Sequence, residues 1–224
     1  MAGEGVSGEP EKNTPLKSLL HLRGKPLLLH AVDNALAVCK RCIVVTGHRR
    51  EEVEAFLQGN RPQVEVVFNR DYRQGMFSSI RAGARLVEND LFFVAPGDMP
   101  MLAPELYRTI LSAARSILAA GSIAAAYAEG FTGPAPESQP VAAWFPEYRG
   151  RRGHPVLINR SLVPLMEGLS PEGRPWRSMR AFLSNFPVCP VPVSSASIFL
   201  DIDTPKNLRE LRERYRNIPV GNGT

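Results

Sequence analysis

The feature that most limits what this chain can fold into is a regular alternation of helical and strand patterns in its first half. Helices are indicated by apolar residues at helical spacing, and strands by short β-branched or apolar runs. The segments in order are helix 26–38, strand 42–46, helix 50–57, strand 64–68, helix 78–86 and strand 91–95. Strands that alternate with helices in units of about 20–30 residues are typical of an open α/β sheet. We therefore predict an α/β fold with a mostly parallel central sheet.

The second half continues this pattern less regularly. It opens with a long helix at 104–120 and a loop at 130–140 that is rich in Gly, Pro and Ser. The other expected elements are strands 122–127, 156–158, 188–193 and 198–202, and helices 162–169, from about 177, and 205–216. These shorter strands suggest a substrate-covering half of the same domain and not a second domain.

The start of the chain fits an open α/β sheet poorly. Residues 1–8 have the composition of a loop, with three glycines and no strand pattern. Doubly wound folds place their first strand at the centre of the sheet. Either that strand lies ahead of Met1, or the first strand of the sheet is missing or truncated.

The charge of the chain favours anionic ligands. The net charge is +5 and the pI is near 9.4, with arginines gathered at 49–50, 149–152 and 209–216. The last group is interleaved with Glu210 and Glu213, which indicates an ion-paired helix face. We favour the binding of small anions, nucleotides among them, over nucleic-acid binding.

Three cysteines, at 39, 42 and 189, are too few for a disulfide framework. Cys39 and Cys42 form a C-x-x-C pair, but zinc would need a second pair of ligands, so two buried small side chains are the better interpretation. The sequence shows no charged-then-apolar leader and no apolar run near ~18 residues. We expect a soluble, cytoplasmic protein with no membrane segment.

Asp98 is the strongest candidate for a metal ligand. It follows the apolar strand 91–95 in the sequence Pro-Gly-Asp-Met-Pro at 96–100. Ligands of open α/β sheets bind outside the carboxyl ends of the strands, and Mg²⁺ is often held there by one or two carboxylates. The alternative is that Asp98 is a turn residue or the N-cap of the helix at 104–120.

Asp201 and Asp203 form a second acidic pair in Leu-Asp-Ile-Asp-Thr-Pro at 200–205. Alternation at the end of a strand would point both carboxylates to one face, as sharing a cation requires. The alternative is that Asp203 or Thr204 caps the last helix.

Two further loops are candidates for phosphate or nucleotide contacts. Lys17, Arg23 and Lys25 follow the Gly-rich opening, although the spacing does not fit a P-loop. Gly75 lies between a strand and a helix, where Ser78 or Ser79 would otherwise cap the helix. His154, in the cationic sequence Gly-Arg-Arg-Gly-His-Pro at 150–155, is either a satisfied polar residue or faces an anionic substrate.

Taken together, these segments resemble the MobA-like nucleoside-triphosphate transferases, and among them the molybdenum-cofactor cytidylyltransferases. The resemblance covers nearly the whole chain. It rests on five short motifs in order: residues 19–28 (Leu-Leu-His-Leu-Arg-Gly-Lys-Pro-Leu-Leu), 69–83, 96–100, 153–156 (Gly-His-Pro-Val) and 201–205 (Asp-Ile-Asp-Thr-Pro).

The resemblance implies a three-layer Rossmann-like, GT-A-type nucleotidyltransferase fold and a reaction. A phosphorylated acceptor such as molybdopterin attacks the α-phosphorus of a nucleoside triphosphate, CTP in this branch, and pyrophosphate leaves. It implies a single domain at 1–217, with a nucleotide-binding half (1–128), an acceptor-binding half (141–217) and a loose tail (218–224). A molybdoenzyme or its chaperone is the implied protein partner.

The resemblance also implies roles for single residues. Asp98 would hold Mg²⁺, or Mn²⁺ in its place, with Asp203 or Asp201 as the second ligand. Lys17 would stabilise the phosphates, while Gly3, Gly5, Gly75 and Ser79 would line the nucleotide and His154 the acceptor.

Two departures from the family pattern keep other functions open. No strand precedes the glycine loop, and residues 171–178 (Pro-Glu-Gly-Arg-Pro-Trp-Arg-Ser) lack the usual aspartate of that element. The alternatives are a sugar-phosphate or guanylyl transferase of the same fold, and a non-catalytic relative that binds a nucleotide or a partner protein.

Overall fold

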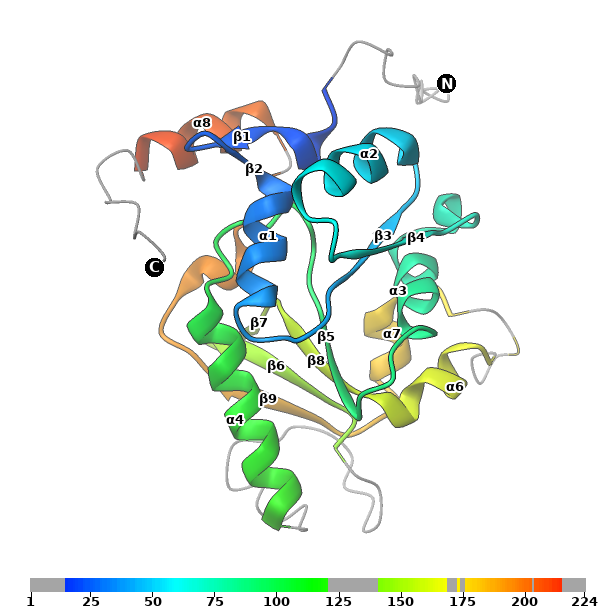
Figure 1. Ribbon diagram of the computed structural model, residues 1–224. Coiled ribbons are helices and arrows are strands. Elements are labelled where there is room, and N and C mark those ends of the chain that lie inside the picture. Colours follow the sequence, from blue (N-terminus) through cyan, green and yellow to red (C-terminus); the bar gives the residue numbers. More distant parts are fainter. Residues whose placement is uncertain (1–14, 121–140, 169–172, 174–175, 203, 215–224) are drawn as a thin grey trace, which may run out of the picture.

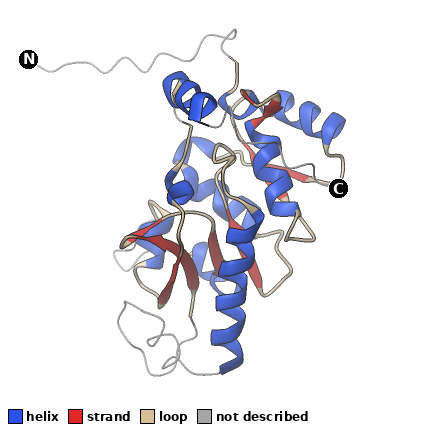
Figure 2. Ribbon diagram, turned by 90° about the vertical axis from the view of Figure 1, so that its left-hand side faces the viewer, coloured by secondary structure: helices blue, strands red, loops and turns tan. Residues whose placement is uncertain are grey.

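The computed structural model describes residues 15–120, 141–168, 173, 176–202 and 204–214. Strands form a central layer that helices cover on both faces, as Figures 1 and 2 show. The predicted α/β class is confirmed.

The first half consists of a short hairpin followed by alternating helices and strands. The hairpin pairs β1 with β2 in antiparallel register, and its turn contains Gly24 at φ +78°, a conformation that glycine adopts without strain. The elements in order are η1 (Lys17–Leu19), β1 (His21–Leu22), β2 (Lys25–Pro26), α1 (Leu27–Leu36), β3 (Ile43–Thr46), α2 (Arg50–Asn60), β4 (Glu65–Phe68), η2 (Tyr72–Gln74), α3 (Met76–Ala84), β5 (Leu91–Val94) and α4 (Pro104–Ala120). Every strand and helix predicted between residues 26 and 120 is present, with ends that move by at most three residues.

The second half supplies a hairpin, a returning strand and shorter helices. Its elements are β6 (Ala143–Tyr148), β7 (Arg151–Arg152), β8 (Val156–Asn159), η3 (Arg160–Leu162), α6 (Val163–Met166), α7 (Met179–Leu183), β9 (Val188–Pro192), η4 (Ala196–Phe199) and α8 (Pro205–Arg214). The expected strand 122–127, the loop 130–140 and the tail 218–224 lie outside the described residues.

The strands are mixed in direction but mostly parallel. β3 and β4 form a parallel pair, and a five-stranded sheet has the order β5-β8-β6-β7 with β9 added to β6. β8 runs against both β5 and β6, whereas β9 runs parallel to β6. β5, β6 and β9 therefore share one direction, and β8 opposes them.

Alternation along the strands divides the core into two layers. Leu157 of β8 packs with α4 on one face, together with Trp144, Cys189 and Val191. Its neighbours Val156 and Ile158 point to the opposite face, where Phe77 of α3 and Phe182 of α7 pack. Because successive side chains of a strand point to opposite faces, one strand contributes to both cores.

The predicted strand at 198–202 is wrong. Residues 196–199 form the 3-10 helix η4, and the Ser195 hydroxyl accepts a hydrogen bond from the Ser197 amide at its start. Ile198 is fully buried there, so the apolar residues that suggested a strand instead fill the core from a turn of helix. In the described chain no strand directly precedes Asp201, so strand alternation gives no reason for Asp201 and Asp203 to share a face.

Strand β6 was not predicted. It contains Pro146, which usually argues against a strand, yet it pairs with β8, β7 and β9. The Pro146 carbonyl oxygen accepts a hydrogen bond from the Gly153 amide across the β6–β7 hairpin. The available signal was the apolar run at 141–145, followed by a Gly-containing turn.

The cysteines were expected to be buried small side chains and not ligands of a metal. None of the three cysteines is in a disulfide, and burial raises the pKa of the Cys42 thiol to about 11, with nearby Cys39 adding to the shift. A thiol with so high a pKa is unreactive at neutral pH, in keeping with a packing role.

Among the described residues, each helix is too short or too polar to cross a bilayer.

Candidate active site

Lys17 and Asp98 form the centre of the candidate site. Lys17 begins η1, ahead of the β1–β2 hairpin, and its Nζ lies 2.6 Å from Oδ2 of Asp98, on the turn after β5. The two side chains are 36% and 26% exposed, so they are open to a ligand from solvent. Asp98 pairs with this lysine, and it is Ala103 that directly precedes α4, so the interpretation of Asp98 as a helix cap is wrong.

The turn that carries Asp98 is joined to the segment 200–205. The Ile202 amide donates a hydrogen bond to the Asp98 carbonyl oxygen at 3.2 Å. Asp201, the exposed residue before it, is thereby held near the Asp98 turn. Thr204 caps α8: its Oγ1 accepts from the Asn207 amide at 3.1 Å, and Asn207 Oδ1 accepts from the Thr204 amide in return. The capping alternative is thus correct for Thr204, and Asp203 lies outside the described residues.

His154 lies two residues before β8, within electrostatic range of the same carboxylates. Its backbone amide donates to the Ile198 carbonyl oxygen at 3.1 Å, and a cis peptide bond joins it to Pro155. Burial lowers the pKa of His154, while the charges of Asp98 and Asp201 oppose the shift. Burial thus favours the neutral imidazole, within electrostatic range of both acidic groups.

Gly75 ends a second loop, after β4, and the serines that follow it lie in the first turn of α3. Gly75 has φ +98° and ψ 177°, a conformation that favours glycine, and α3 begins at the next residue. Asn69, which is 5% exposed, donates from Nδ2 to the hydroxyls of Ser78 (2.8 Å) and Ser79 (3.0 Å).

The Ser78 hydroxyl in turn donates to the carbonyl oxygens of Asp71 and Gly75. Neither serine caps α3, whose first residue follows Gly75 without a side-chain cap. The serines instead fix the loop that leads into this helix.

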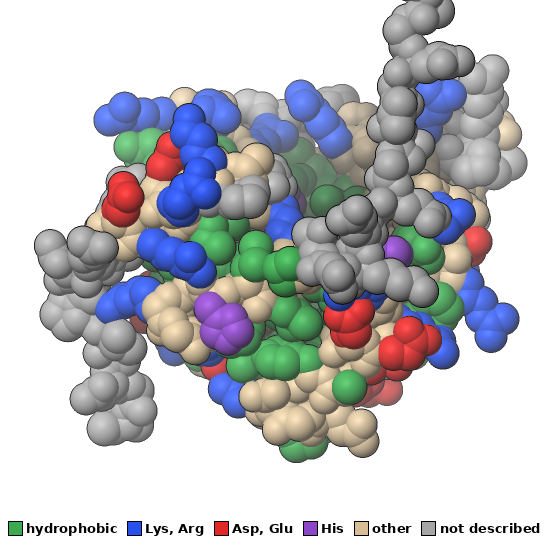
Figure 3. All heavy atoms as spheres, turned by 90° about the horizontal axis from the view of Figure 1, so that it is seen from above, with side chains coloured by type: hydrophobic (Ala, Val, Ile, Leu, Met, Phe, Trp, Pro, Cys, Tyr) green, Lys and Arg blue, Asp and Glu red, His purple; other side chains and the backbone are tan. Residues whose placement is uncertain are grey.

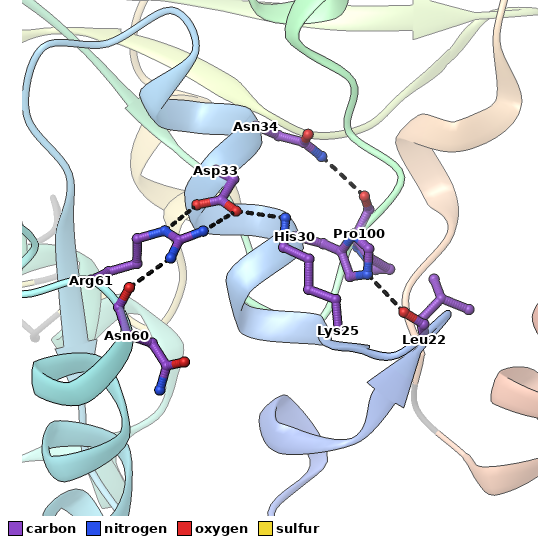
Figure 4. A network of polar contacts seen from close by, with 8 residues as sticks. All are labelled: Leu22, Lys25, His30, Asp33, Asn34, Asn60, Arg61 and Pro100. Atoms are coloured by element: carbon purple, nitrogen blue, oxygen red, sulfur yellow. Dashed lines mark hydrogen bonds and ion pairs between the residues drawn. The ribbon is translucent and has the colours of Figure 1, made fainter. Parts of the chain in front are cut away.

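A polar network that the sequence analysis missed supports the elements next to Lys17. Figure 4 shows that the carboxylate of Asp33, on α1, contacts the side chains of Arg61 at the end of α2 and Lys25 of β2. Arg61 donates from Nε at 2.6 Å and from Nη2 at 2.7 Å, and the Lys25 ammonium lies at 2.5 Å. Burial opposes ionisation of Asp33, but the hydrogen bonds from Arg61 and Lys25 prevail and its pKa is lowered. No local motif links residues 28 positions apart, so this network had no signal in the sequence.

Basic side chains are spread over one face of the molecule. Figure 3 looks onto the end of the molecule where α8, β1 and α2 lie, and Lys and Arg side chains are spread around the rim of this face. Acidic side chains form smaller groups among them. Such a distribution suits a phosphorylated substrate.

The structure thus brings some of the predicted site residues together, while others lie outside the described residues. Lys17, Asp98, Asp201 and His154 come together around the end of β5. Gly75 ends the separate loop after β4, and Ser79 lies in the first turn of α3. Gly3, Gly5 and Asp203 lie outside the described residues.

Comparison with known proteins identifies the class. A family model for the MobA-like NTP transferase domain matches residues 12–186. The molybdenum cofactor cytidylyltransferase of Escherichia coli K12 is 29% identical over 203 residues, covering 90% of this chain and 90% of that protein.

Solved structures agree in fold. A nucleotidyl transferase from Methanothermobacter (Mth528) superposes with a TM-score of 0.63 at 23% identity, covering 89% of this chain and 85% of that one. Rv0371c from Mycobacterium tuberculosis H37Rv, solved with manganese, has a TM-score of 0.61 at 20% identity and covers 88% and 91%.

The similarity to these structures shows that this chain has the Rossmann-like fold of nucleotidyltransferases. Because the family model spans well over half of the sequence, the chain belongs to the MobA-like NTP transferase domain family. It is accordingly a nucleotidyltransferase.

Proposed function

We propose that this enzyme transfers CMP from CTP to a phosphorylated acceptor such as the molybdopterin cofactor and releases pyrophosphate. The observation that carries the proposal is the Lys17–Asp98 pair, held at the carboxyl end of β5 beside His154. The choice of CTP and acceptor is supported by the E. coli relative, which is named a molybdenum cofactor cytidylyltransferase and aligns along 90% of this chain.

The residues present fit a magnesium ion that is shared with substrate. Asp98 already holds a cationic group, the Lys17 ammonium, against one carboxylate oxygen. Among the described residues, no three His, Cys, Asp or Glu side chains are grouped as a metal site. Mg²⁺ commonly uses one or two carboxylates plus substrate phosphates, so Asp98 with Asp203 or Asp201 suffices. Bound there, Mg²⁺ or Mn²⁺ would neutralise charge on the phosphates.

Lys17 is the group that we expect to bind the phosphates. Its charge is balanced by Asp98, so the two do not repel an approaching nucleotide. A triphosphate offers more negative charge than one carboxylate, and we expect Lys17 to turn to it. The ammonium then stabilises the charge that develops as the bond from the α-phosphorus to the pyrophosphate oxygen breaks and an acceptor phosphate oxygen bonds to the same phosphorus.

The remaining candidates position the two substrates. Burial favours the neutral form of His154, whose remaining ring N–H can donate a hydrogen bond to an acceptor phosphate. Gly75 and Ser79, with Gly3 and Gly5, are proposed to line the nucleotide. We place the reaction in the cytoplasm, with a molybdoenzyme or its chaperone receiving the product.

The proposal is tested by measuring pyrophosphate release with each of the four nucleoside triphosphates in turn, in the presence of Mg²⁺. Molybdenum-loaded molybdopterin and a hexose 1-phosphate serve as the two acceptors. We expect turnover with CTP and the pterin. Turnover with GTP only, or with the sugar phosphate only, would overturn the proposed specificity. Nucleotide binding without any turnover would overturn catalysis and favour a binding protein.

A further inference from the structure

The β6–β7 hairpin extends past the end of β5, on the side of the sheet that carries the candidate active site. β5 and β6 both run antiparallel to β8, so their carboxyl ends lie at the same edge. Val94, the last residue of β5, pairs with Val156, and Trp144 of β6 pairs with the next residue, Leu157. β6 continues to Tyr148, three residues beyond the level of Val94, which is about 10 Å at strand spacing.

The hairpin is packed against the segment that leads into the site. Gly153, directly after β7, contacts the Ile198 carbonyl oxygen, and the His154 amide donates a hydrogen bond to the same oxygen at 3.1 Å. Ile198 and Phe199 belong to η4, and Asp201 follows two residues after Phe199. The hairpin, η4 and the site residues His154 and Asp201 therefore form one packed unit.

Aromatic rings hold two exposed arginines of this hairpin. The Arg151 Cζ lies 4.5 Å from the centre of the Phe199 ring, and the Arg149 Cζ lies 5.2 Å from the centre of the Tyr148 ring. Cations within about 6 Å of a ring centre are attracted by it. Tyr148 is directly opposite Arg151 in the strand register. The two guanidinium groups are therefore oriented within one small region of the surface.

These two positive charges are not neutralised by the protein. In the described part of the chain Arg149 and Arg151 form no ion pair, whereas the next arginine, Arg152, lies 3.8 Å from Glu147. Like charges held near one another repel, and an anion bound between them removes the repulsion. A guanidinium group is planar and donates two parallel hydrogen bonds to a phosphate or a carboxylate. The hairpin thus offers a site for an oxyanion.

The backbone at the tip of the hairpin also argues that Arg149 is there for its side chain. Arg149 has φ +51° and Gly150 has φ +73°, and positive φ at both central residues is the signature of a type I′ turn. Such turns favour Asn, Asp or Gly at the first central position. Arginine there costs backbone strain, and strain of this kind is retained where it serves a function.

We propose that Arg149 and Arg151 bind an oxyanion of the acceptor, while Lys17 and Asp98 bind the nucleotide and its metal. This acceptor role rests on the proposed function. The hairpin belongs to the sheet of order β5-β8-β6-β7, whereas Gly75, which we propose to line the nucleotide, follows β4 in a separate strand pair. The oxyanion is either the phosphate that reacts or a second anionic group of the acceptor.

The test measures KM for CTP and for molybdenum-loaded molybdopterin in three variants. We expect Arg151→Gln to raise the KM for the acceptor about tenfold, as the loss of a charge-assisted hydrogen bond does, and to leave the KM for CTP unchanged. Arg149→Gly should also raise the acceptor KM, with an equal or higher Tm, because glycine adopts a positive φ without strain. The control is Arg115→Gln, exposed on α4, which should change neither KM.

The turnover number distinguishes the two sources of the oxyanion. If a second anionic group is bound, Arg151→Gln keeps its kcat, and if the reacting phosphate is bound, kcat falls as the acceptor KM rises. An acceptor KM unchanged by Arg151→Gln would overturn the proposal. An equal rise in the KM for CTP would overturn it as well, because the hairpin would then serve the nucleotide.

Equilibrium dialysis of the same pterin, without CTP, separates this proposal from the proposed function. Weaker binding to Arg151→Gln, without turnover by the unmodified protein, would support the oxyanion site and overturn the proposed reaction. Turnover by the unmodified protein, with equal pterin affinity in the two proteins, would overturn the oxyanion site and leave the reaction intact. Binding to neither protein would overturn both.

Discussion

Gly153 shows at the residue scale how closely the turn before β8 packs on the loop that carries η4. A Cβ at this position would collide with the Ile198 carbonyl oxygen and lie 2.8 Å from the Ile198 Cβ. We expect Gly153→Ala to lower the free energy of unfolding by about 1–3 kcal/mol, as overpacking does, measured by urea denaturation. Gly59→Ala in α2, where nothing lies within 4 Å, is the control and should stabilise by up to about 1 kcal/mol. Identical midpoints for Gly153→Ala and the unmodified protein would contradict this packing.

His30 provides a pH-dependent prediction. Burial lowers its pKa from the usual 6.5, the hydrogen bond to the Leu22 carbonyl opposes the shift, and the Lys25 charge adds to it. Protonation is then easier in the unfolded chain, so this residue makes the free energy of unfolding fall as the pH drops through about 6.5 and below. An NMR titration should place the pKa of His30 below 6.5, and Lys25→Gln should raise it. A pKa above 6.5 would be inconsistent with the burial of this imidazole.

Single residues were predictable where their type and local position carry the chemistry. Asp98 was identified because an aspartate follows an apolar strand within a Gly- and Pro-containing turn, and the structure places it beside Lys17. The network of Asp33, Lys25 and Arg61 was not predictable, because its members lie on three elements and only the fold brings them together.

At the scale of elements, Asn69 fixes the loop that joins β4 to α3. It accepts from the Asp71 amide at 3.0 Å and donates to both Ser78 and Ser79. Asn69→Ala leaves buried polar partners unsatisfied, so we expect a loss of about 1–3 kcal/mol in the free energy of unfolding. Asn60→Ala is the control, since Asn60 is exposed and bonds only within its own helix end. If both variants unfold at the same urea concentration, the loop does not depend on Asn69.

Elements were predictable where periodicity is strong, as in α1, α4 and β5. The error at 198–202 arose because a short apolar run fits a strand and a buried turn of 3-10 helix equally well. The Ser195 hydroxyl caps η4 and so favours the 3-10 helix. β6 was not predicted, although the apolar run at 141–145 was a signal for it; Pro146 makes its composition unusual for a strand.

At the scale of the whole molecule, the α/β class was predictable and the sheet order was not. The reversal of β8 between β5 and β6 depends on pairing between distant segments, which no local pattern encodes. The single domain at 1–217 and its two halves remain a prediction.

The central claim is that nucleotidyl transfer takes place at the turn after β5. Asp98 lies at the carboxyl end of this strand, and the exposed Asp90 lies at its other end, where its carbonyl oxygen accepts from the Arg160 amide. The most direct test compares pyrophosphate release by Asp98→Ala and Asp90→Ala, with CTP, Mg²⁺ and the pterin acceptor, after equal unfolding midpoints have been established. We predict that Asp98→Ala loses at least about a hundredfold in rate while Asp90→Ala keeps the rate of the unmodified enzyme. Equal rates for the two variants would contradict the account.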